Sequence, residues 1–137
     1  MRVYLAGPIN GCTDLQANGW RDIVRNTLAG RVELVDPMAR DYRGHEDADA
    51  RAIVEGDKAD IEACDVVLAY CWQPSYGTAM EIHHAWTKGI PVFVAGRRPY
   101  SPWLSYHART FDGIGDAVLE IARLAAASRS PGTRGTP

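Results

Sequence analysis

The stretch that decides the fold runs from residue 66 to residue 81 and reads Val66-Val67-Leu68-Ala69-Tyr70-Cys71-Trp72-Gln73-Pro74-Ser75-Tyr76-Gly77-Thr78-Ala79-Met80-Glu81. A hydrophobic strand over 66–70 is followed by a turn-rich loop, and a helix then begins that carries a carboxylate in its first turn. In an open α/β sheet, ligands bind where strands end and helices begin, because backbone N–H groups are free there and the helix dipole is positive. The sequence therefore places Glu81 at a candidate ligand-binding edge.

Glu81 also has a purely structural interpretation. The spacing Thr78-x-x-Glu81 matches a capping box, in which the two side chains satisfy each other's backbone N–H groups at a helix N-terminus. The motif alone is compatible with Glu81 as a structural helix cap and with Glu81 as a catalytic carboxylate.

Asp57 is the second carboxylate of interest. The segment from Arg51 to Cys64 has a helical pattern, and one stripe of it contains Ile53, Asp57, Ile61 and Cys64. A carboxylate facing a protein interior is costly unless it is paired or hydrogen-bonded. Asp60 lies at the edge of the same stripe, so helical phase does not separate the two aspartates, and a structural Asp that pairs nearby is the competing interpretation. Two carboxylates at one crevice are the minimum equipment for cleaving a glycosidic bond with retention.

Composition excludes several classes of protein. The chain has 137 residues, 46% hydrophobic and 23% charged, with a formal net charge of -2. These values are typical of a single globular domain and show no basic footprint for a nucleic-acid polymer. Three cysteines are too few for a disulfide scaffold, and no His/Cys/Asp cluster suggests a metal. With no signal-peptide pattern and no apolar run of membrane-spanning length, we expect a cytoplasmic protein without metal or cofactor.

The rest of the chain alternates between strand and helix patterns. Strands are expected at 2–6, 32–35, 66–70, 92–95 and near 110–111, and helices at about 15–28, 51–64, 78–88 and 117–126. Loops are expected at 36–48 and 100–107, and residues 128–137 are expected to form a disordered tail after a domain of residues 1–127. Alternation of this kind predicts a doubly wound, flavodoxin- or Rossmann-like α/β domain with a parallel sheet of about five strands. Neither a G-x-G-x-x-G nor a GK[ST] motif occurs, so dinucleotide and P-loop functions are poor candidates.

Four ordered motifs then identify a family. They are Tyr4-Leu5-Ala6-Gly7-Pro8, Asp41-Tyr42-Arg43-Gly44, Asp57-x3-Ile61-x3-Asp65 and Ser75-x-Gly77-Thr78-x2-Glu81-Ile82. In this order the chain resembles the nucleoside 2-deoxyribosyltransferases, whose superfamily includes nucleoside 5′-monophosphate N-glycosidases. The resemblance covers nearly the whole chain up to about residue 126.

The resemblance implies roles for individual residues. Glu81 takes the position of the nucleophile, Asp57 rather than Asp60 takes that of the acid that protonates the leaving base, and Tyr4 orients the glutamate. Asp41 lies in the loop that faces the base, where many transferases have an amide, so the base preference stays open. Ser75 takes the position that contacts the 5′ end of the sugar, where transferases often have Asp or Asn and monophosphate-cleaving relatives have a small hydroxyl residue. The further substrate-binding candidates are Gly7, Pro8, Ile9, Arg43, Gly77, Thr78, Trp103 and His107.

The resemblance also implies a partner and leaves alternatives. Family members are dimers or larger, so we expect a homo-oligomer in which the loop 101–107 of a neighbouring subunit completes each site. The leading hypothesis is a transferase that passes deoxyribose from a nucleoside to another nucleobase. The alternative is a nucleoside 5′-monophosphate N-glycosidase, and a third possibility is a non-catalytic nucleotide-binding module on the same fold. Without the resemblance, Tyr4 would be interpreted as an ordinary core residue and Arg43 as a solvated loop residue. Trp103 could belong to a subunit interface as easily as to the wall of a substrate site.

Overall fold

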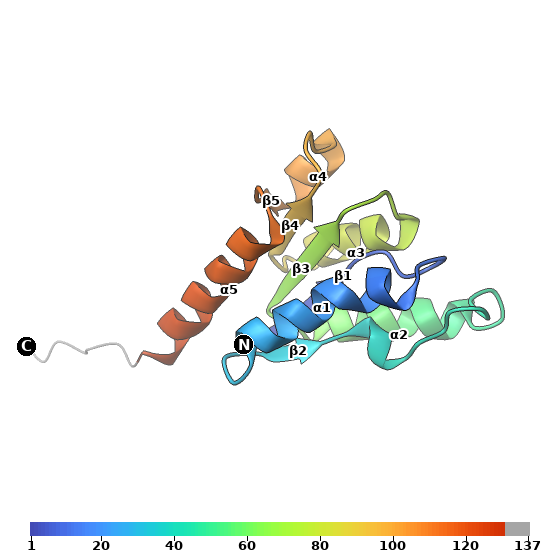
Figure 1. Cartoon of the computed structure of the whole chain (residues 1–137), viewed down its shortest axis with the longest axis horizontal. Coiled ribbons are helices and arrows are strands. Elements are labelled where there is room, and N and C mark those ends of the chain that lie inside the picture. Colours follow the sequence, from blue (N-terminus) through green and yellow to red (C-terminus); the bar gives the residue numbers. More distant parts are fainter. Residues whose placement is uncertain (131–137) are drawn as a thin grey trace, which may run out of the picture.

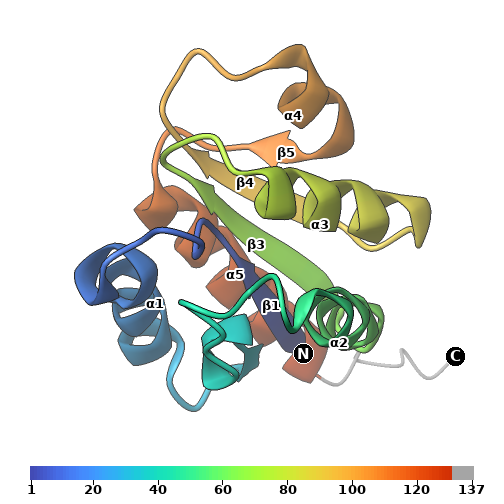
Figure 2. The same cartoon turned by 90° about the vertical axis from the view of Figure 1, so that its right-hand side faces the viewer.

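The protein is a parallel sheet covered by helices on both faces, which Figures 1 and 2 show in two views 90° apart. The computed structural model describes residues 1–130. The elements are β1 (Arg2–Ala6), α1 (Asp14–Leu28), β2 (Glu33–Val35), a 3-10 turn (Pro37–Ala39), α2 (Ala50–Glu62), β3 (Val66–Cys71), α3 (Tyr76–Thr87), β4 (Val92–Gly96), α4 (Pro102–His107), β5 (Arg109–Thr110) and α5 (Ile114–Arg129).

The strand order is β2-β1-β3-β4-β5, and every pairing is parallel. This order confirms the expected doubly wound α/β fold of five strands. The chain reverses its winding direction between the neighbouring strands β1 and β3, and ligands of such sheets bind at the carboxyl ends of the strands at that reversal. Two predicted segments leave the sheet there, the loop that begins at Gly7 and the loop that leads to Ser75.

The central strands carry core residues on both faces because helices cover both (Figure 2). On β1, Val3 and Leu5 join the core cluster that α1 and α5 cover, whereas Tyr4 and Ala6 join the cluster that α2 and α3 cover. This alternation follows from the two-residue period of a strand. It places the phenol of Tyr4 on the face where the helices that carry Asp57 and Glu81 pack.

Three sequence expectations differ from the structure. The expected loop 100–107 contains the helix α4, because Ser101 accepts a hydrogen bond from the Trp103 backbone N–H and Pro102 occupies the first helical position. The last helix extends past 126 to Arg129, whose guanidinium donates to the carbonyls of Gly30 and Arg31. Residues 128 and 129 are therefore helical and not part of a disordered tail, and 131–137 lie outside the described residues.

The third correction concerns the capping box. Helix α3 begins at Tyr76, two residues before the expected start at Thr78, and its N-cap is Ser75. The Ser75 hydroxyl accepts from the Thr78 N–H at 3.3 Å and from the Thr78 hydroxyl at 3.1 Å. Thr78 is therefore inside the helix, and Glu81 is too far along it to cap its N-terminus. Within residues 1–130, no helix is both long enough and apolar enough to cross a membrane.

Candidate active site

Tyr4 and Glu81 form the central contact of the site. The Tyr4 hydroxyl donates a short hydrogen bond to Oε2 of Glu81, joining two residues that are 77 positions apart in the sequence. Tyr4 is fully buried in the middle of the sheet, and Ile82, the neighbour of Glu81 on α3, is buried in the same core cluster. The glutamate that sequence analysis treated as a possible cap is thus held by a hydrogen bond from the central sheet.

Desolvation dominates the electrostatics of Glu81. The residue keeps part of its surface in contact with solvent, but its carboxyl group is withdrawn from water, and this raises its pKa to about 8. The Tyr4 hydrogen bond opposes the rise, the charge of Asp57 adds to it, and the charge of Arg21 opposes it. Burial and the neighbouring carboxylates also raise the pKa of the Tyr4 phenol, so Tyr4 keeps its proton and remains a donor.

Asp57 lies on α2 close enough to couple electrically to both Tyr4 and Glu81. Its side chain is 21% exposed, and partial burial raises its pKa to about 6. Arg40, 3.7 Å away, lowers this pKa, and Asp60 raises it. Asp60 itself forms an ion pair with Arg40. The structure thereby distinguishes the two aspartates that helical phase could not, since Asp57 couples to Glu81 and Asp60 makes the closer ion pair with Arg40.

The loop after β1 is held from inside the protein by Arg21. This residue of α1 is fully buried, and its guanidinium donates to the carbonyls of Gly7 at 3.3 Å and of Leu5 at 3.5 Å. It also lies 3.2 Å from a carboxylate oxygen of Asp36, which follows β2. A Cβ on Gly7 would approach the Trp20 ring to 2.7 Å, so only glycine fits where the chain leaves the strand. Arg21 thus joins the carboxyl ends of β1 and β2 and adds a buried positive charge below the carboxyl pair.

Arg43 joins two loops of the site to each other. Its guanidinium contacts Asp41 at 2.7 Å, Asp14 at 2.6 Å and the carbonyl of Cys12 at 3.2 Å. These contacts tie the loop between β2 and α2 to the start of α1. Asp41 and Arg43, both predicted to bind substrate, therefore also bind each other.

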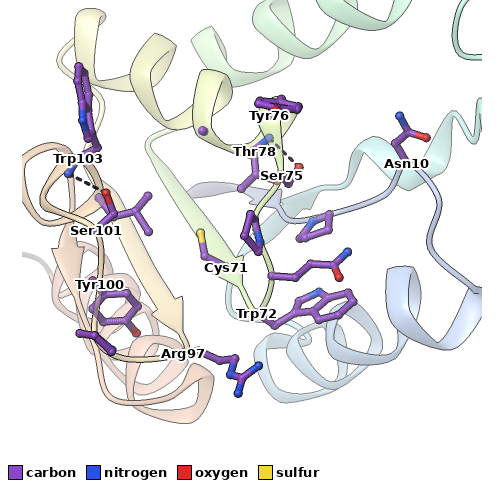
Figure 3. A pocket seen from close by; sticks show the side chains of 17 residues that line it. Asn10, Cys71, Trp72, Ser75, Tyr76, Thr78, Arg97, Tyr100, Ser101 and Trp103 are labelled. Carbon is purple, nitrogen blue, oxygen red and sulfur yellow. Dashed lines mark hydrogen bonds between the residues drawn. The ribbon is translucent and has the colours of Figure 1, made fainter.

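A cleft of about 870 Å³ opens between the first turn of α3 and the segment that joins β4 to α4. Figure 3 shows Tyr100 and Ser101 on one wall, and Cys71, Trp72 and Ser75 on the other. Of the residues predicted to bind substrate, Pro8, Ser75, Gly77, Thr78 and Trp103 line this cleft.

The remaining predicted residues lie outside the cleft lining. Glu81, Tyr4 and Asp57 form the carboxyl cluster, while Gly7 and Ile9 belong to the loop after β1. Thr78 and Glu81 are three residues apart on α3 and are therefore neighbours on one side of the helix. Because Thr78 lines the cleft and Glu81 belongs to the carboxyl cluster, the two regions adjoin each other. His107 is not brought to the cleft, because its ring packs among Trp86, Trp103 and Tyr106 and its Nδ1 lies 2.7 Å from the carbonyl of Trp103.

Sequence reasoning missed Arg21 and Arg40. Arg21 lies on the buried stripe of α1 next to Trp20 and close to Val24, so a charged residue at that phase was the available signal. Arg40 sits in a loop, and nothing in its local sequence indicates that it reaches α2. In the described part of the chain, no three His, Cys, Asp or Glu side chains are grouped to hold a metal ion.

Comparisons with known proteins identify a family and several solved structures that have the same fold. The family model for nucleoside 2-deoxyribosyltransferase matches residues 3–130. Solved structures with the same fold include a conserved protein from Enterococcus faecalis V583, with a TM-score of 0.70 and 20% identity over 90% of this chain and 98% of that chain. A 2-deoxyribosyltransferase from Bacillus psychrosaccharolyticus has a TM-score of 0.69 and 16% identity over 86% and 90%. A CMP N-glycosidase from Clostridium botulinum has a TM-score of 0.58 and 15% identity over 88% and 98%. No curated protein matches the sequence at the significance that these structures reach.

Proposed function

Because the chain belongs to the nucleoside 2-deoxyribosyltransferase family, enzymes that act as glycosyltransferases or N-glycosidases on nucleosides or nucleotides, we propose that it transfers deoxyribose from a 2′-deoxynucleoside to another nucleobase. The observation that carries the proposal is the Glu81 carboxyl, held by the Tyr4 hydroxyl and coupled to Asp57. A nucleophile that is oriented by a second group and stands beside a proton donor is the arrangement that covalent catalysis needs.

The proposed chemistry is a double displacement. An oxygen of Glu81 attacks the anomeric carbon, the carbon–nitrogen bond breaks, and the departing base takes the electron pair and a proton from Asp57. The product of this step is a deoxyribosyl ester of Glu81. A second base then attacks the same carbon from the face that the first base left, returns a proton to Asp57 and releases Glu81. If water takes the place of the second base, the outcome is hydrolysis.

The two carboxyls hold one proton between them near neutral pH. Their pKa values are both raised, to about 8 for Glu81 and to about 6 for Asp57, so before substrate binds this proton lies mainly on Glu81. The reaction needs that proton on Asp57 and a negative charge on Glu81. A bound substrate favours this distribution, because it removes water from Asp57 and places the electron-poor anomeric carbon at Glu81.

Ser75 gives the hydrolase alternative its specific support. The hydroxyl stands at the N-terminus of α3 beside Gly77 and Thr78, in the wall of the cleft. A helix N-terminus accepts a phosphate without any Lys or Arg, and no Asp or Glu lies within residues 72–80 to repel one. A nucleoside 5′-monophosphate is therefore the second candidate substrate, and the similarity to a CMP N-glycosidase points the same way. The commoner activity of the family keeps the free nucleoside in first place.

One experiment separates these functions. The protein is incubated with a deoxynucleoside or with its 5′-monophosphate, each with and without a second base, and the products are separated. Formation of the exchanged nucleoside supports the transferase. Release of free base from the monophosphate alone, with no exchange, shows the hydrolase. Tight binding without bond cleavage of either substrate shows a nucleotide-binding module.

We also propose that the protein is a homo-oligomer in which a neighbouring subunit closes the cleft. Large exposed side chains gather on α3 and α4, and they are Tyr76, Met80, Trp86, Trp103 and Tyr106. Ring contacts link Trp86 to Tyr106, and His107 touches both, so much of this surface is one aromatic patch. Patches of this kind mark interaction sites.

The test of the oligomer is the molar mass in solution, measured by light scattering. Tyr106→Glu should lower the mass to that of one chain, because a charge is placed in the patch. Leu119→Glu, at an exposed position on α5 under the opposite face of the sheet, is the matched control and should leave the mass unchanged. A wild-type protein that has the mass of one chain at all concentrations would refute the proposal.

A further inference from the structure

Arg40 connects the loop between β2 and α2 to the helix that carries Asp57. It follows the 3-10 turn Pro37–Ala39, and its Nη2 forms an ion pair with Oδ2 of Asp60. The same nitrogen lies 3.7 Å from Oδ1 of Asp57. Asp57 and Asp60 are three residues apart on α2, so their carboxylates stand on one face of the helix and share this cation.

Gly56 makes room for the arginine. A Cβ at this position would lie 3.1 Å from Nη2 and 3.3 Å from Cζ of Arg40, which is closer than an ordinary van der Waals contact. Glycine in the interior of a helix is unfavourable relative to alanine, so its presence here agrees with a guanidinium that packs against the helix backbone. Two independent features of α2, the Asp60 anchor and the missing side chain of Gly56, thus fix Arg40 beside Asp57.

We propose that Arg40 is a positioning residue for Asp57: Asp60 anchors its guanidinium, and this anchored cation holds the loop 36–49 on α2 and stands beside the Asp57 carboxylate. The inference rests on the proposed function only in that it takes Asp57 to be the acid. Arg40 itself has no need to touch the substrate. Its side chain is 44% exposed, so its removal opens no cavity in the core.

The charged groups around Asp57 determine whether its pKa rises or falls when one of them is removed. The charged and titratable groups that face it are Tyr4 from β1, Arg21 from α1, Glu81 from α3, Asp60 from its own helix and Arg40 from the loop. Arg40 favours the ionised form of Asp57, and the negative charge of Asp60 disfavours it. Removal of the arginine and removal of Asp60 must therefore move the Asp57 titration in opposite directions.

The experiment is an NMR titration of the Asp57 carboxyl in the ligand-free protein. In Arg40→Gln the midpoint should rise by about one pH unit, the low end of the shift that a nearby opposite charge produces, because this arginine is partly exposed. In Asp60→Asn the midpoint should fall, since the repulsion between the two carboxylates disappears. Arg40→Lys keeps the charge but loses the planar fork, and its midpoint should lie between those of the wild type and Arg40→Gln. Arg51→Gln removes an exposed cation from the same helix and should leave the midpoint unchanged.

The outcomes distinguish this inference from the proposed function. Equal Asp57 midpoints in the wild type and Arg40→Gln, or shifts in the same direction in Arg40→Gln and Asp60→Asn, would overturn the role of Arg40 whatever the activity. When the midpoints move as expected, the pH–rate profile should move with them, because the rate depends on the fraction of the protein that carries a proton on Asp57. Midpoints that move while the whole pH–rate profile stays fixed would support the role of Arg40 and would contradict the role of Asp57 as the acid.

Discussion

Replacement of Glu81 by glutamine should abolish turnover and at the same time stabilise the protein at alkaline pH. The amide has nearly the same shape and can still accept the hydrogen bond from Tyr4, so the local packing is kept. It cannot attack a carbon as a carboxylate does, and turnover should fall by several orders of magnitude. It also cannot ionise, which removes the cost of holding a negative charge in a desolvated position beside Asp57.

The size of the stability gain follows from the pKa. Below pH 4.5 the carboxyl is protonated in both the folded and the unfolded chain, so the variant gains nothing there. Between pH 4.5 and about 8 the unfolded chain loses its proton while the folded chain keeps it, so the wild-type stability falls as pH rises. The full difference corresponds to about 5 kcal/mol at about 1.4 kcal/mol per pH unit. Because Glu81 retains some contact with water, we expect a gain of about 2–3 kcal/mol at pH 9.

Urea denaturation of both proteins at pH 4, 7 and 9 measures this difference, with equal m-values required for the comparison. Glu55→Gln, at an exposed position on α2, is the charge-matched control and should show no trend with pH. A stability difference between Glu81→Gln and the wild type that is the same at pH 4 and pH 9 would refute the claim that the Glu81 carboxyl is desolvated. Near-normal turnover of the folded variant would refute the proposal that Glu81 is the nucleophile.

Three further substitutions test the neighbours of Glu81. Tyr4→Phe removes the hydrogen bond that lowers the pKa of Glu81, so this pKa should rise above 8 and kcat/KM should fall about 10- to 100-fold, measured as a pH–rate profile; an unchanged profile would contradict the contact. Asp57→Asn should slow substrates with poor leaving bases far more than those with an activated leaving group, and Asp60→Asn should show no such dependence; the reverse ranking in a leaving-group series would exchange their roles. Ser75→Asp keeps a good N-cap but brings a negative charge to the cleft, where two like charges about 4 Å apart cost on the order of 4 kcal/mol. Turnover of a 5′-monophosphate should therefore disappear while turnover of the free nucleoside persists, and retained monophosphate turnover would show that the phosphate binds elsewhere.

The fold was predictable because its signals are local. A run of five apolar residues predicts a buried strand, and the alternation of such runs with helical patterns predicts a parallel sheet. The errors arose at short elements and at helix ends. The helix α4 spans only six residues, and the Ser101-Pro102 start that identifies it is a short signal inside an aromatic segment. The start of α3 was misplaced by two residues because both Ser75 and Thr78 are good N-cap residues, and the sequence does not rank them.

The site was predictable only as far as the motifs reach. The resemblance singled out Glu81, Asp57 and Tyr4, and the structure places these three side chains close enough to interact. Their contact depends on strands and helices far apart in the chain, so no spacing rule could show that the Tyr4 hydroxyl meets the glutamate. The same holds for Arg40, whose contact with Asp60 joins a loop to a helix 20 residues later. Long-range ion pairs of this kind carry no sequence period.

The buried arginine of α1 also bears on the order in which the site can form during folding. Arg21 binds carbonyls 14 and 16 residues before it, whereas Tyr4 and Glu81 meet across 77 positions. Contacts close in sequence lose less chain entropy when they form, so the unit from β1 to β2 can close before α3 arrives. We therefore expect Val24→Ala, in the interior of that unit, to slow folding, and Ile82→Val, beside the glutamate, to speed unfolding, as stopped-flow chevrons would measure. Glu81 would then reach its place only after the loops that follow β1 and β2 have formed, and a partly folded chain would contain these loops without the carboxyl that we propose as the nucleophile.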